Sequence, residues 1–464
     1  MQATETMTVP TPQPVIHTPT LTKTAVSPTS APPILYTTQA GDTLPSLAVR
    51  FNVNVDEIES PELLPEFGLL DPNILLIIPD RLDQIGPPDH LIPDSEVVYS
   101  PSAIDFDIET FVVNAGGYLS TYTEHMSNGN LSGAQVVQRV AIENSINPRL
   151  LLSILEYQSH WVYGQPRNIA ETDYPIGYKN LLKKGLYHQL SWAVSQLSLG
   201  YYGWRAGLVT ELAFSNNDTI RLAPDLNAGT VAVQFLFSKL YDQRNWGGVL
   251  YSPGSLPELH QQMFESPWLR AQLVEPLYPT TLTQPALVLP FQPKTVWSLT
   301  GGPHSAWGPD GALAALDFAP ASESHGCTES IDWVTASAAG LVVRSGNGIV
   351  MVDMDGDGHE QTGWAMLYLH IASKDRVAEG VWLNTNDRIG HPSCEGGSST
   401  GTHVHVARKF NGEWILADGP MPFNLSNWIA KNGSEPYQGW LIKEDVLVRA
   451  SMVGEFDSRI IRVE

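Results

Sequence analysis

The sequence predicts a multidomain protein with three folded parts: a small β-α-α-β domain, a mainly α-helical middle region and a mainly antiparallel β C-terminal domain. Three observations predict this division. The chain has 464 residues, which is more than one hydrophobic core usually serves. The apolar pattern changes from short β-branched runs to helical spacing and then back to short runs. Proline-rich stretches at residues 1–33 and 81–107 separate the parts and predict linkers.

Composition and charge limit the possible partners. The chain carries 26 basic and 49 acidic residues, a net charge of −23, which argues against binding nucleic acid or an anionic membrane surface. No apolar run reaches the roughly 18 residues of a transmembrane helix, so we expect no integral membrane span. The first residues lack the basic region and apolar core of a signal peptide, so the export signal is absent from this sequence.

The small domain is predicted over residues 34–80, after a disordered Pro/Thr-rich linker at 1–33. A strand around Tyr36 leads into a Gly-Asp turn, and Thr43 can cap a helix that runs through Phe51. We expect a second helix to start at Asn54, and the run Ile74–Pro79 predicts a closing strand.

This order of elements, with Gly41-Asp42-Thr43-Leu44 at its start and an Ile-Ile-Pro run at its end, resembles a LysM domain. The resemblance implies binding of N-acetylglucosamine-containing glycans such as peptidoglycan, with Gly41, Asp42 and Thr43 as the glycan-binding residues. The asparagine usual after the second helix of the family is replaced here by Ser60-Pro61-Glu62.

The helical region is predicted over residues 108–290, after a second linker at 81–107. Asn147-Pro148 predicts a helix start, because asparagine is a good N-cap and proline suits the first turn. Later helices are predicted at Gln189–Trp204 and Thr230–Tyr241. The aromatic residues in and near these helices could stack on sugars, but at helical spacing they are more often core; they are Trp192, Tyr201, Tyr202 and Trp204.

The stretch from Asn147 to Ser159 resembles the first catalytic helix of lysozyme-like lytic transglycosylases, in which a Glu-Ser pair carries the general acid. Here Gln158 stands before Ser159, and an amide cannot donate a proton as a carboxylic acid does. Glu156 lies two positions earlier and therefore on another helix face. The resemblance implies a degenerate domain kept for glycan contact or spacing.

The C-terminal domain is predicted over residues 291–445, followed by a tail at 446–464. Short apolar runs separated by Gly, Asp and Asn predict an antiparallel sheet. The order of Asp317, Tyr368-Leu369-His370 and Ser399-Thr400-Gly401-Thr402-His403-Val404-His405 resembles the LytM/lysostaphin-type peptidases of family M23. The resemblance implies a zinc metalloendopeptidase that cleaves peptide stems or cross-bridges of peptidoglycan.

Carried over position by position, the resemblance makes Asp317 and His405 zinc ligands, and it makes His370 and His403 the two catalytic histidines that do not bind zinc. The first ligand of the family falls on Leu313, which cannot bind zinc. We expect His304 to replace it, with Ser305–Ala312 looping out between the two ligands. The rivals are His325 and His391. If no third ligand exists, the alternative function is a non-catalytic peptidoglycan-binding or regulatory protein.

Two further features complete the expectations. Cys327 and Cys394 are the only cysteines, and an exported protein would favour their pairing as a disulfide. Asp353-Met354-Asp355-Gly356-Asp357-Gly358 copies the front of a calcium loop, but no glutamate closes it, and a hairpin turn is the better interpretation. The expected location is extracellular or associated with the cell envelope, and the sequence leaves the oligomeric state open.

Overall fold

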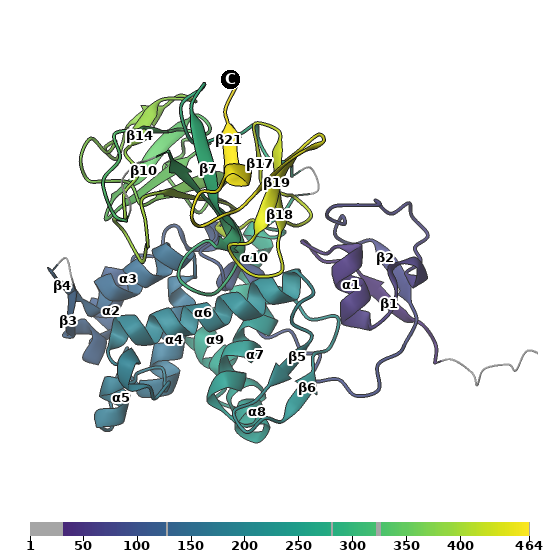
Figure 1. The fold of residues 1–464 in the computed structure, drawn as a ribbon. Coiled ribbons are helices and arrows are strands. Elements are labelled where there is room, and N and C mark those ends of the chain that lie inside the picture. Colours follow the sequence, from purple (N-terminus) through teal and green to yellow (C-terminus); the bar gives the residue numbers. More distant parts are fainter. Residues whose placement is uncertain (1–30, 127–128, 280–281, 322–325, 464) are drawn as a thin grey trace, which may run out of the picture.

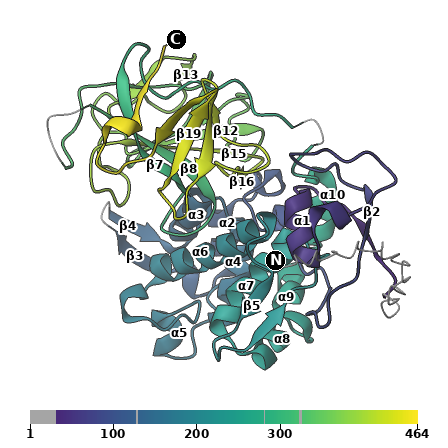
Figure 2. The ribbon, with the colours of Figure 1, turned by 45° about the vertical axis from the view of Figure 1, so that its right-hand side comes forward.

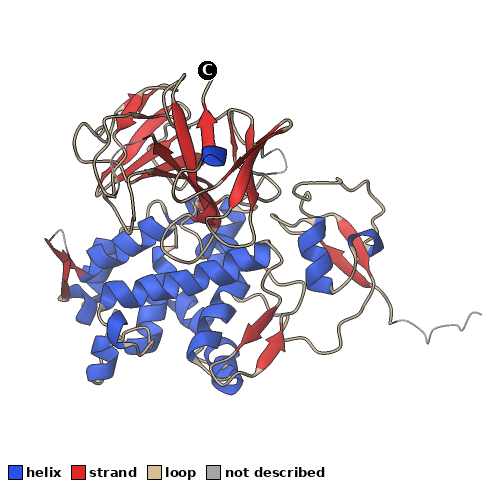
Figure 3. Ribbon diagram, in the orientation of Figure 1, coloured by secondary structure: helices blue, strands red, loops and turns tan. Residues whose placement is uncertain are grey.

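The three expected parts are present in the computed structural model, which describes residues 31–126, 129–279, 282–321 and 326–463 (Figures 1 and 3). A small domain lies at one side, a helical region forms the base, and a β-rich region lies on the helices. Most of the predicted linker at residues 1–33 falls outside the described residues. Within the described part of the chain, no helix is both long and apolar enough to span a membrane.

The small domain consists of one antiparallel strand pair, one helix and a single 3-10 turn. Strand β1 (Ile34–Thr37) pairs with β2 (Leu75–Ile78), and α1 (Leu44–Phe51) packs against them. The Thr43 hydroxyl accepts a hydrogen bond from the backbone N–H of Ser46, as a cap should.

The second helix that we predicted from Asn54 is wrong, because only a 3-10 turn forms at Val55–Glu57. Pro61 and Pro65 follow closely, and proline removes a backbone donor and clashes with the preceding helical turn. The domain therefore has the order β-α-β.

The middle region is helical, as predicted. Its helices are α2 (Ile108–Ala115), α3 (Gly133–Asn144), α4 (Pro148–Ser159), α5 (Ile169–Asp173), α6 (Leu186–Arg205), α7 (Ala228–Leu240), α8 (Gln243–Tyr251), α9 (Leu256–Phe264) and α10 (Pro267–Val274). Two short hairpins accompany them, β3 (Thr123–Met126) with β4 (Gly129–Ser132) and β5 (Glu211–Ala213) with β6 (Thr219–Arg221). The Asn147 side chain caps α4 by accepting from the backbone N–H of Arg149, which confirms the predicted helix start.

The second predicted linker, residues 81–107, is too long. Val97 and Val98 are fully buried in the core of the helical region, and Glu96 forms an ion pair with Arg270. The segment also contains 3-10 turns at Asp94–Glu96 and Pro101–Ala103. Proline and aspartate suggested a linker, but composition does not reveal that the apolar residues between them have tertiary partners.

The β-rich region contains one large antiparallel sheet and one smaller sheet. The large sheet has the order β13-β10-β11-β12-β15-β8-β7-β21, with β16 paired to β15. Its strands are β7 (Val296–Ser305), β8 (Leu313–Pro320), β10 (Gly340–Gly346), β11 (Ile349–Asp353), β12 (Trp364–Leu369), β13 (Trp382–Leu383), β15 (Val404–Phe410), β16 (Glu413–Trp414) and β21 (Arg459–Ile461). The smaller sheet is β17 (Asn424–Leu425), β18 (Trp428–Asn432), β19 (Gly439–Lys443) and β20 (Val446–Arg449), and β9 (Val334–Thr335) pairs with β14 (Arg388–Gly390).

The predicted C-terminal tail at 446–464 is part of this region instead. Strand β20 pairs with β19, and β21 adds to the edge of the large sheet beside β7. The buried Arg462 guanidinium donates to the carbonyls of Leu289 and Phe291. The last residues of the chain thus hold the first residues of the β-rich region in place.

The two faces of the large sheet bury different cores. The cross-strand row Ala315, Ala407, Leu367 and Met351 belongs to the hydrophobic cluster that also contains the helices, whereas the next row, Leu316, Val406, Tyr368 and Val350, belongs to a cluster within the β-rich region. This alternation is what a strand period of two requires. Figures 1 and 2 both show the sheet above α3 and α6.

The tip of the β15–β16 hairpin joins the sheet to the helices through buried polar contacts. The Ser145 hydroxyl donates to the Gly412 carbonyl at 2.7 Å, and Glu413 accepts from the Tyr201 hydroxyl at 2.9 Å and pairs with Arg205. Glu413 is 1% exposed, so removing its partners would leave a buried charge uncompensated.

Gly412 provides a test of this junction. Its φ is +80°, and an added Cβ would lie 2.1 Å from the carbonyl oxygen of Tyr99. Gly412→Ala should therefore cost about 2 kcal/mol more unfolding free energy than Gly358→Ala. Gly358 has φ +94° with no atom within 4 Å, so it controls for backbone strain alone. Urea unfolding of the full chain measures both, and equal losses would mean that the hairpin tip is loosely seated.

Candidate metal centre

Three side chains predicted as metal ligands converge on one point of the large sheet. His304 lies near the end of β7, Asp317 on β8 and His405 on β15, and these strands are neighbours. The distance from His304 Nε2 to Asp317 Oδ1 is 3.2 Å, and His405 Nδ1 is 3.2 Å from the same oxygen. The two histidine nitrogens are 3.0 Å apart. All three side chains are buried.

Strand register and an irregular β7 produce this convergence. His405 is directly opposite Asp317 on β15, whereas on β7 the residue opposite Asp317 is Gly301. The pairing between β7 and β8 shifts between Gly301 and His304, which brings the His304 ring toward Asp317. A Cβ at Gly301 would lie 2.6 Å from the Asp317 carboxylate, so glycine leaves room for the ligand.

The expected loop between the ligands is present. Strand β7 ends at Ser305 and β8 begins at Leu313, so the residues between them connect two paired strands. Leu313, at the position of the family's first ligand, is paired with Ser305. His304 reaches the cluster instead because it lies across the hairpin from Ala315, two residues from Asp317.

Hydrogen bonds to carbonyls fix which nitrogen of each ligand faces the cluster. His304 Nδ1 is 2.8 Å from the carbonyl of Gly302, and His405 Nε2 is 3.0 Å from the carbonyl of Ala306. Because a carbonyl only accepts, each of these nitrogens carries the proton. The nitrogens that face Asp317 therefore have free lone pairs, the form that binds a metal.

Asp317 provides an independent test of whether a metal fits. Its Oδ1 atom is buried and has no hydrogen-bond partner of good geometry among the described residues. An unsatisfied buried carboxylate oxygen is costly, and a cation between it and the two nitrogens would satisfy it. The donor set of two imidazoles and one carboxylate suits zinc and other borderline metals.

The charges of the cluster depend on one another. Burial alone would raise the pKa of Asp317, but His304 and His403 outweigh it and hold that pKa well below its ordinary value. Burial lowers the pKa of His405, against the effect of Asp317. Burial would also lower the pKa of His304, but Asp317 outweighs burial and raises that pKa.

The two predicted catalytic histidines lie beside the cluster. The His370 and His403 rings are 4.5 Å apart, and His403 Nε2 is 3.6 Å from Asp317 Oδ1. His370 Nδ1 is 2.8 Å from the carbonyl oxygen of Glu395, and His403 Nδ1 is 2.8 Å from the carbonyl oxygen of Gly401. Burial and the neighbouring His403 lower the pKa of His370 to about 3, so His370 is neutral at physiological pH.

Sequence reasoning missed Tyr437, which stacks on His304 with ring centroids 4.1 Å apart. It lies in the connection between β18 and β19 and is 44% exposed, so it forms part of the accessible surface at the cluster. No motif surrounds it, and its proximity to His304 arises only because β19 packs near β7.

Of the two rival ligands, His391 takes no part in the cluster. His391 is buried elsewhere, with Nδ1 2.8 Å from the carbonyl of Asp332 and its ring beside Trp333. His325 lies outside the described residues. Cys327 and Cys394 are bonded as a disulfide, in agreement with the expected pairing.

The Asp-Gly-rich segment connects β11 to β12, which agrees with a hairpin turn. Asp353, Asp355 and Asp357 lie close together, but the Asp353 carboxylate accepts hydrogen bonds from the backbone N–H groups of Asp355 and Gly358. The same bonds would hold a turn without any ion.

Of the predicted glycan-binding residues, Asp42 and Thr43 are engaged within the small domain, whereas Gly41 lines a cleft. Asp42 is 2% exposed, and its carboxylate binds the Tyr36 hydroxyl and the Arg50 guanidinium. Thr43 caps α1, and Gly41 packs against Arg205 of the helical region. These residues stabilise the small domain and its contact with the helices.

The helical region contains no glutamate at the predicted acid position. The Gln158 amide accepts from the Tyr241 hydroxyl at 2.6 Å, and Glu156 accepts from the backbone N–H groups of Val162 and Tyr163. Glu156 therefore stabilises a loop. Of the aromatic residues considered for sugar stacking, Tyr201, Tyr202 and Trp204 are buried in the core, and Trp192 stacks on Tyr178.

Residues 90–278 match the family model described as LasA, N-terminal domain. The chain is 25% identical over 356 residues to protease LasA of Pseudomonas aeruginosa, which covers 73% of this chain and 79% of that protein. It is 28% identical over 141 residues to the beta-lytic metalloendopeptidase of Achromobacter lyticus, covering 29% of this chain and 35% of that protein.

Among solved structures, one described as a novel M23 metalloprotease, pseudoalterin, from the deep sea is similar, with a TM-score of 0.30 and 24% identity. It covers 37% of this chain and 96% of that one.

The ligand cluster and the similarity to protease LasA and to the beta-lytic metalloendopeptidase agree on one class of protein, a metalloendopeptidase. The helical region corresponds to the N-terminal domain of LasA. Its resemblance to lytic transglycosylases, and that of the small domain to LysM, stay predictions.

The first ligand is tested by metal content. His304→Ala should lower bound zinc from about one ion per chain toward zero, because two ligands hold zinc far more weakly than three. His391→Ala removes another buried histidine and should leave the zinc content unchanged. Mass spectrometry for metals, with circular dichroism to verify folding, measures both, and retained zinc in His304→Ala would exclude this ligand.

Acid should release the metal. A histidine must be neutral to bind zinc, and Asp317 raises the pKa of His304, so protons compete with the metal as the pH falls through that pKa. We expect full zinc content after dialysis at about pH 8 and a clear loss at about pH 5.5. The lower value stays above the isoelectric point of about 4.8, which limits precipitation. Equal zinc content at both pH values would contradict this assignment.

Proposed function

We propose that this protein is a zinc metalloendopeptidase that cleaves peptide stems or cross-bridges of bacterial peptidoglycan. The observation that carries the proposal is the convergence of His304 Nε2, Asp317 Oδ1 and His405 Nδ1, with the proton of each histidine held by a carbonyl. The similarity to protease LasA and to the beta-lytic metalloendopeptidase supports the same class of reaction.

In this proposal His304, Asp317 and His405 hold the zinc ion. Bound there, zinc supplies a Lewis acid and lowers the pKa of a water molecule toward neutrality. His403 and Tyr437 are the cluster neighbours with the most exposed surface, so a substrate would approach the ligands from their side.

His370 and His403 would move protons during hydrolysis. Each donates its Nδ1 hydrogen to a backbone carbonyl, so Nε2 is an acceptor. An acceptor beside the ligands can take a proton from the attacking water and return it to the leaving amine. The low pKa of His370 keeps it neutral, which suits orienting the water; His403, closer to Asp317, is the better proton carrier.

The same proposal extends to location and to the other parts of the chain. A disulfide between Cys327 and Cys394 is typical of proteins outside the reducing cytoplasm, which supports an extracellular or envelope location. We assign the small domain to glycan targeting, as its resemblance to LysM implies. We assign the helical region a non-catalytic role, because Gln158 replaces the acid.

Digestion of cell-wall sacculi by the full chain tests the proposal. Wild type should release peptides with new amino termini, and a zinc chelator should stop the release. His370→Ala and His403→Ala should keep zinc but lower the rate by about 10²- to 10⁴-fold, the usual range for general acid–base catalysis. His359→Ala removes an exposed histidine of the same region and should act like wild type. Digestion that survives His405→Ala would refute the metal mechanism.

A further inference from the structure

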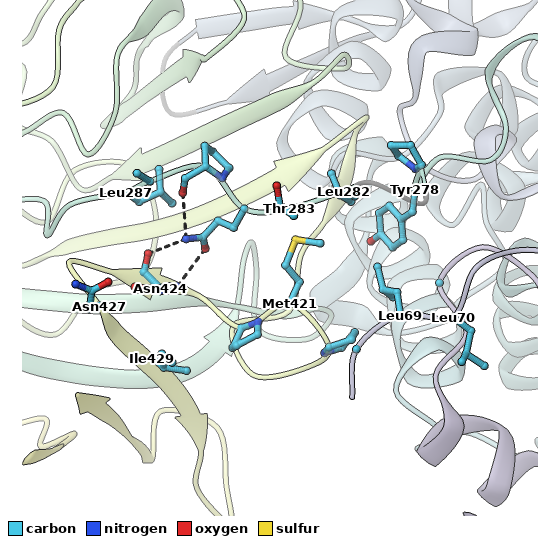
Figure 4. Close-up of a pocket in the computed structure, with 18 of the residues that line it drawn as sticks. Leu69, Leu70, Tyr278, Leu282, Thr283, Leu287, Met421, Asn424, Asn427 and Ile429 are labelled. Carbon is cyan, nitrogen blue, oxygen red and sulfur yellow. Dashed lines mark hydrogen bonds between the residues drawn. The ribbon is translucent and has the colours of Figure 1, made fainter. Parts of the chain in front are cut away.

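We propose that a cleft between the small N-terminal domain and the β-rich region binds an uncharged oligosaccharide, away from the metal centre. The identification of that ligand with the glycan strand of peptidoglycan rests on the proposed function. The cleft has a volume of about 800 Å³, within the range of specific ligand sites. Its walls are the loop Gly68–Pro72, the residues from Leu282 to Val288 and the segment Pro420–Ile429 (Figure 4).

Three uncharged polar side chains of the cleft have no partner among the described residues. Gln284, by contrast, is fully engaged, since its amide forms hydrogen bonds with the backbone of Asn424 and the side chain of Arg408. The side chains of Thr283, Asn424 and Asn427 make no hydrogen bond to any described residue, although all three line the cleft. Two amides and a hydroxyl offer both donors and acceptors, which hydroxyl-rich ligands need.

The remaining lining favours a neutral ligand with apolar faces. Asp71 is the only charged residue among the described residues that line the cleft, and none of these is a lysine or arginine that could bind an anion. Leu69, Leu282 and Met421 supply apolar surface (Figure 4). A pyranose ring with acetamido groups combines C–H faces, methyl groups and neutral hydrogen-bonding groups, which matches this lining.

The position of the cleft relates it to the metal centre. Ile429 lines the cleft, and β18 runs from there to Asn432, about 10 Å of strand. The connection that follows carries Tyr437, which stacks on His304. A glycan held in the cleft would therefore keep its attached peptides near the cluster of His304, Asp317 and His405. Glycan binding would raise the local concentration of scissile peptide at the metal centre, while the cleft residues take no part in the chemistry.

Binding of an N-acetylglucosamine hexamer to the full chain, measured by titration calorimetry, tests this proposal. Wild type should bind saturably, and a chain with Asn424→Ala and Asn427→Gly should bind about 10-fold more weakly, the loss expected from two hydrogen bonds. Glycine is chosen because Asn427 has φ +66° in the β17–β18 turn, a conformation that glycine adopts without strain. Thr283→Ala provides a second variant outside that turn.

The control is Asn114→Ala, which removes an exposed amide from α2 on the helical region and should bind like wild type. Absence of binding, or equal binding by the cleft variants, would overturn the proposal, as would binding of an uncharged peptide in place of the saccharide. His405→Ala should bind the hexamer normally while losing sacculus digestion. Loss of saccharide binding in the cleft and loss of the proposed peptidase activity can therefore be told apart.

Discussion

The metal centre depends on the pairing register of three adjacent strands. His405 lies directly opposite Asp317, and the irregular pairing of β7 brings His304 to the other side of the same carboxylate. A slip of one residue would turn a ligand to the opposite face of the sheet, because side chains alternate along a strand. The register is in turn held by apolar rows on both faces, so packing far from the ligands determines whether they meet.

The face that carries the ligands is also the face that the helical region covers. Asp317 and His405 project to the same side as Ala315 and Ala407, which belong to the cluster shared with the helices. The helices therefore complete the hydrophobic core of the sheet. The buried Glu413 and Arg205 pair adds a polar contact that is favourable only while both partners are in place. The helical region and the sheet consequently behave as parts of one folded unit.

Backbone carbonyls prepare the histidines for their roles. Those of Gly302 and Ala306 hold the ligands, and those of Glu395 and Gly401 hold the two neighbouring histidines. Gly302 lies within β7, and Ala306, Glu395 and Gly401 lie in connections between strands. Fixing the proton on one nitrogen of each ring leaves the other as an acceptor, which avoids the cost of reorganising the rings when a metal or water binds. Tyr437 adds a packing contact on His304 from the smaller sheet.

The sequence by itself determined the features that depend on local pattern. The two-residue spacing of His403 and His405, the apolar runs around Asp317 and the cap at Asn147 predicted the strands, two of the ligands and a helix start, because periodicity and capping act over a few residues. Only the tertiary structure decided the rest. His304 was expected as the third ligand, but the sequence left His325 and His391 open, and it is a shift in strand pairing that places His304 in the cluster. The predicted tail became β20 and β21, and Val97 and Val98 of the predicted linker joined the hydrophobic core. Asp42 and Thr43, predicted to bind glycan, are buried in local contacts. These outcomes depend on partners far away in the chain, and neither composition nor local propensity reveals which distant residues will pack together.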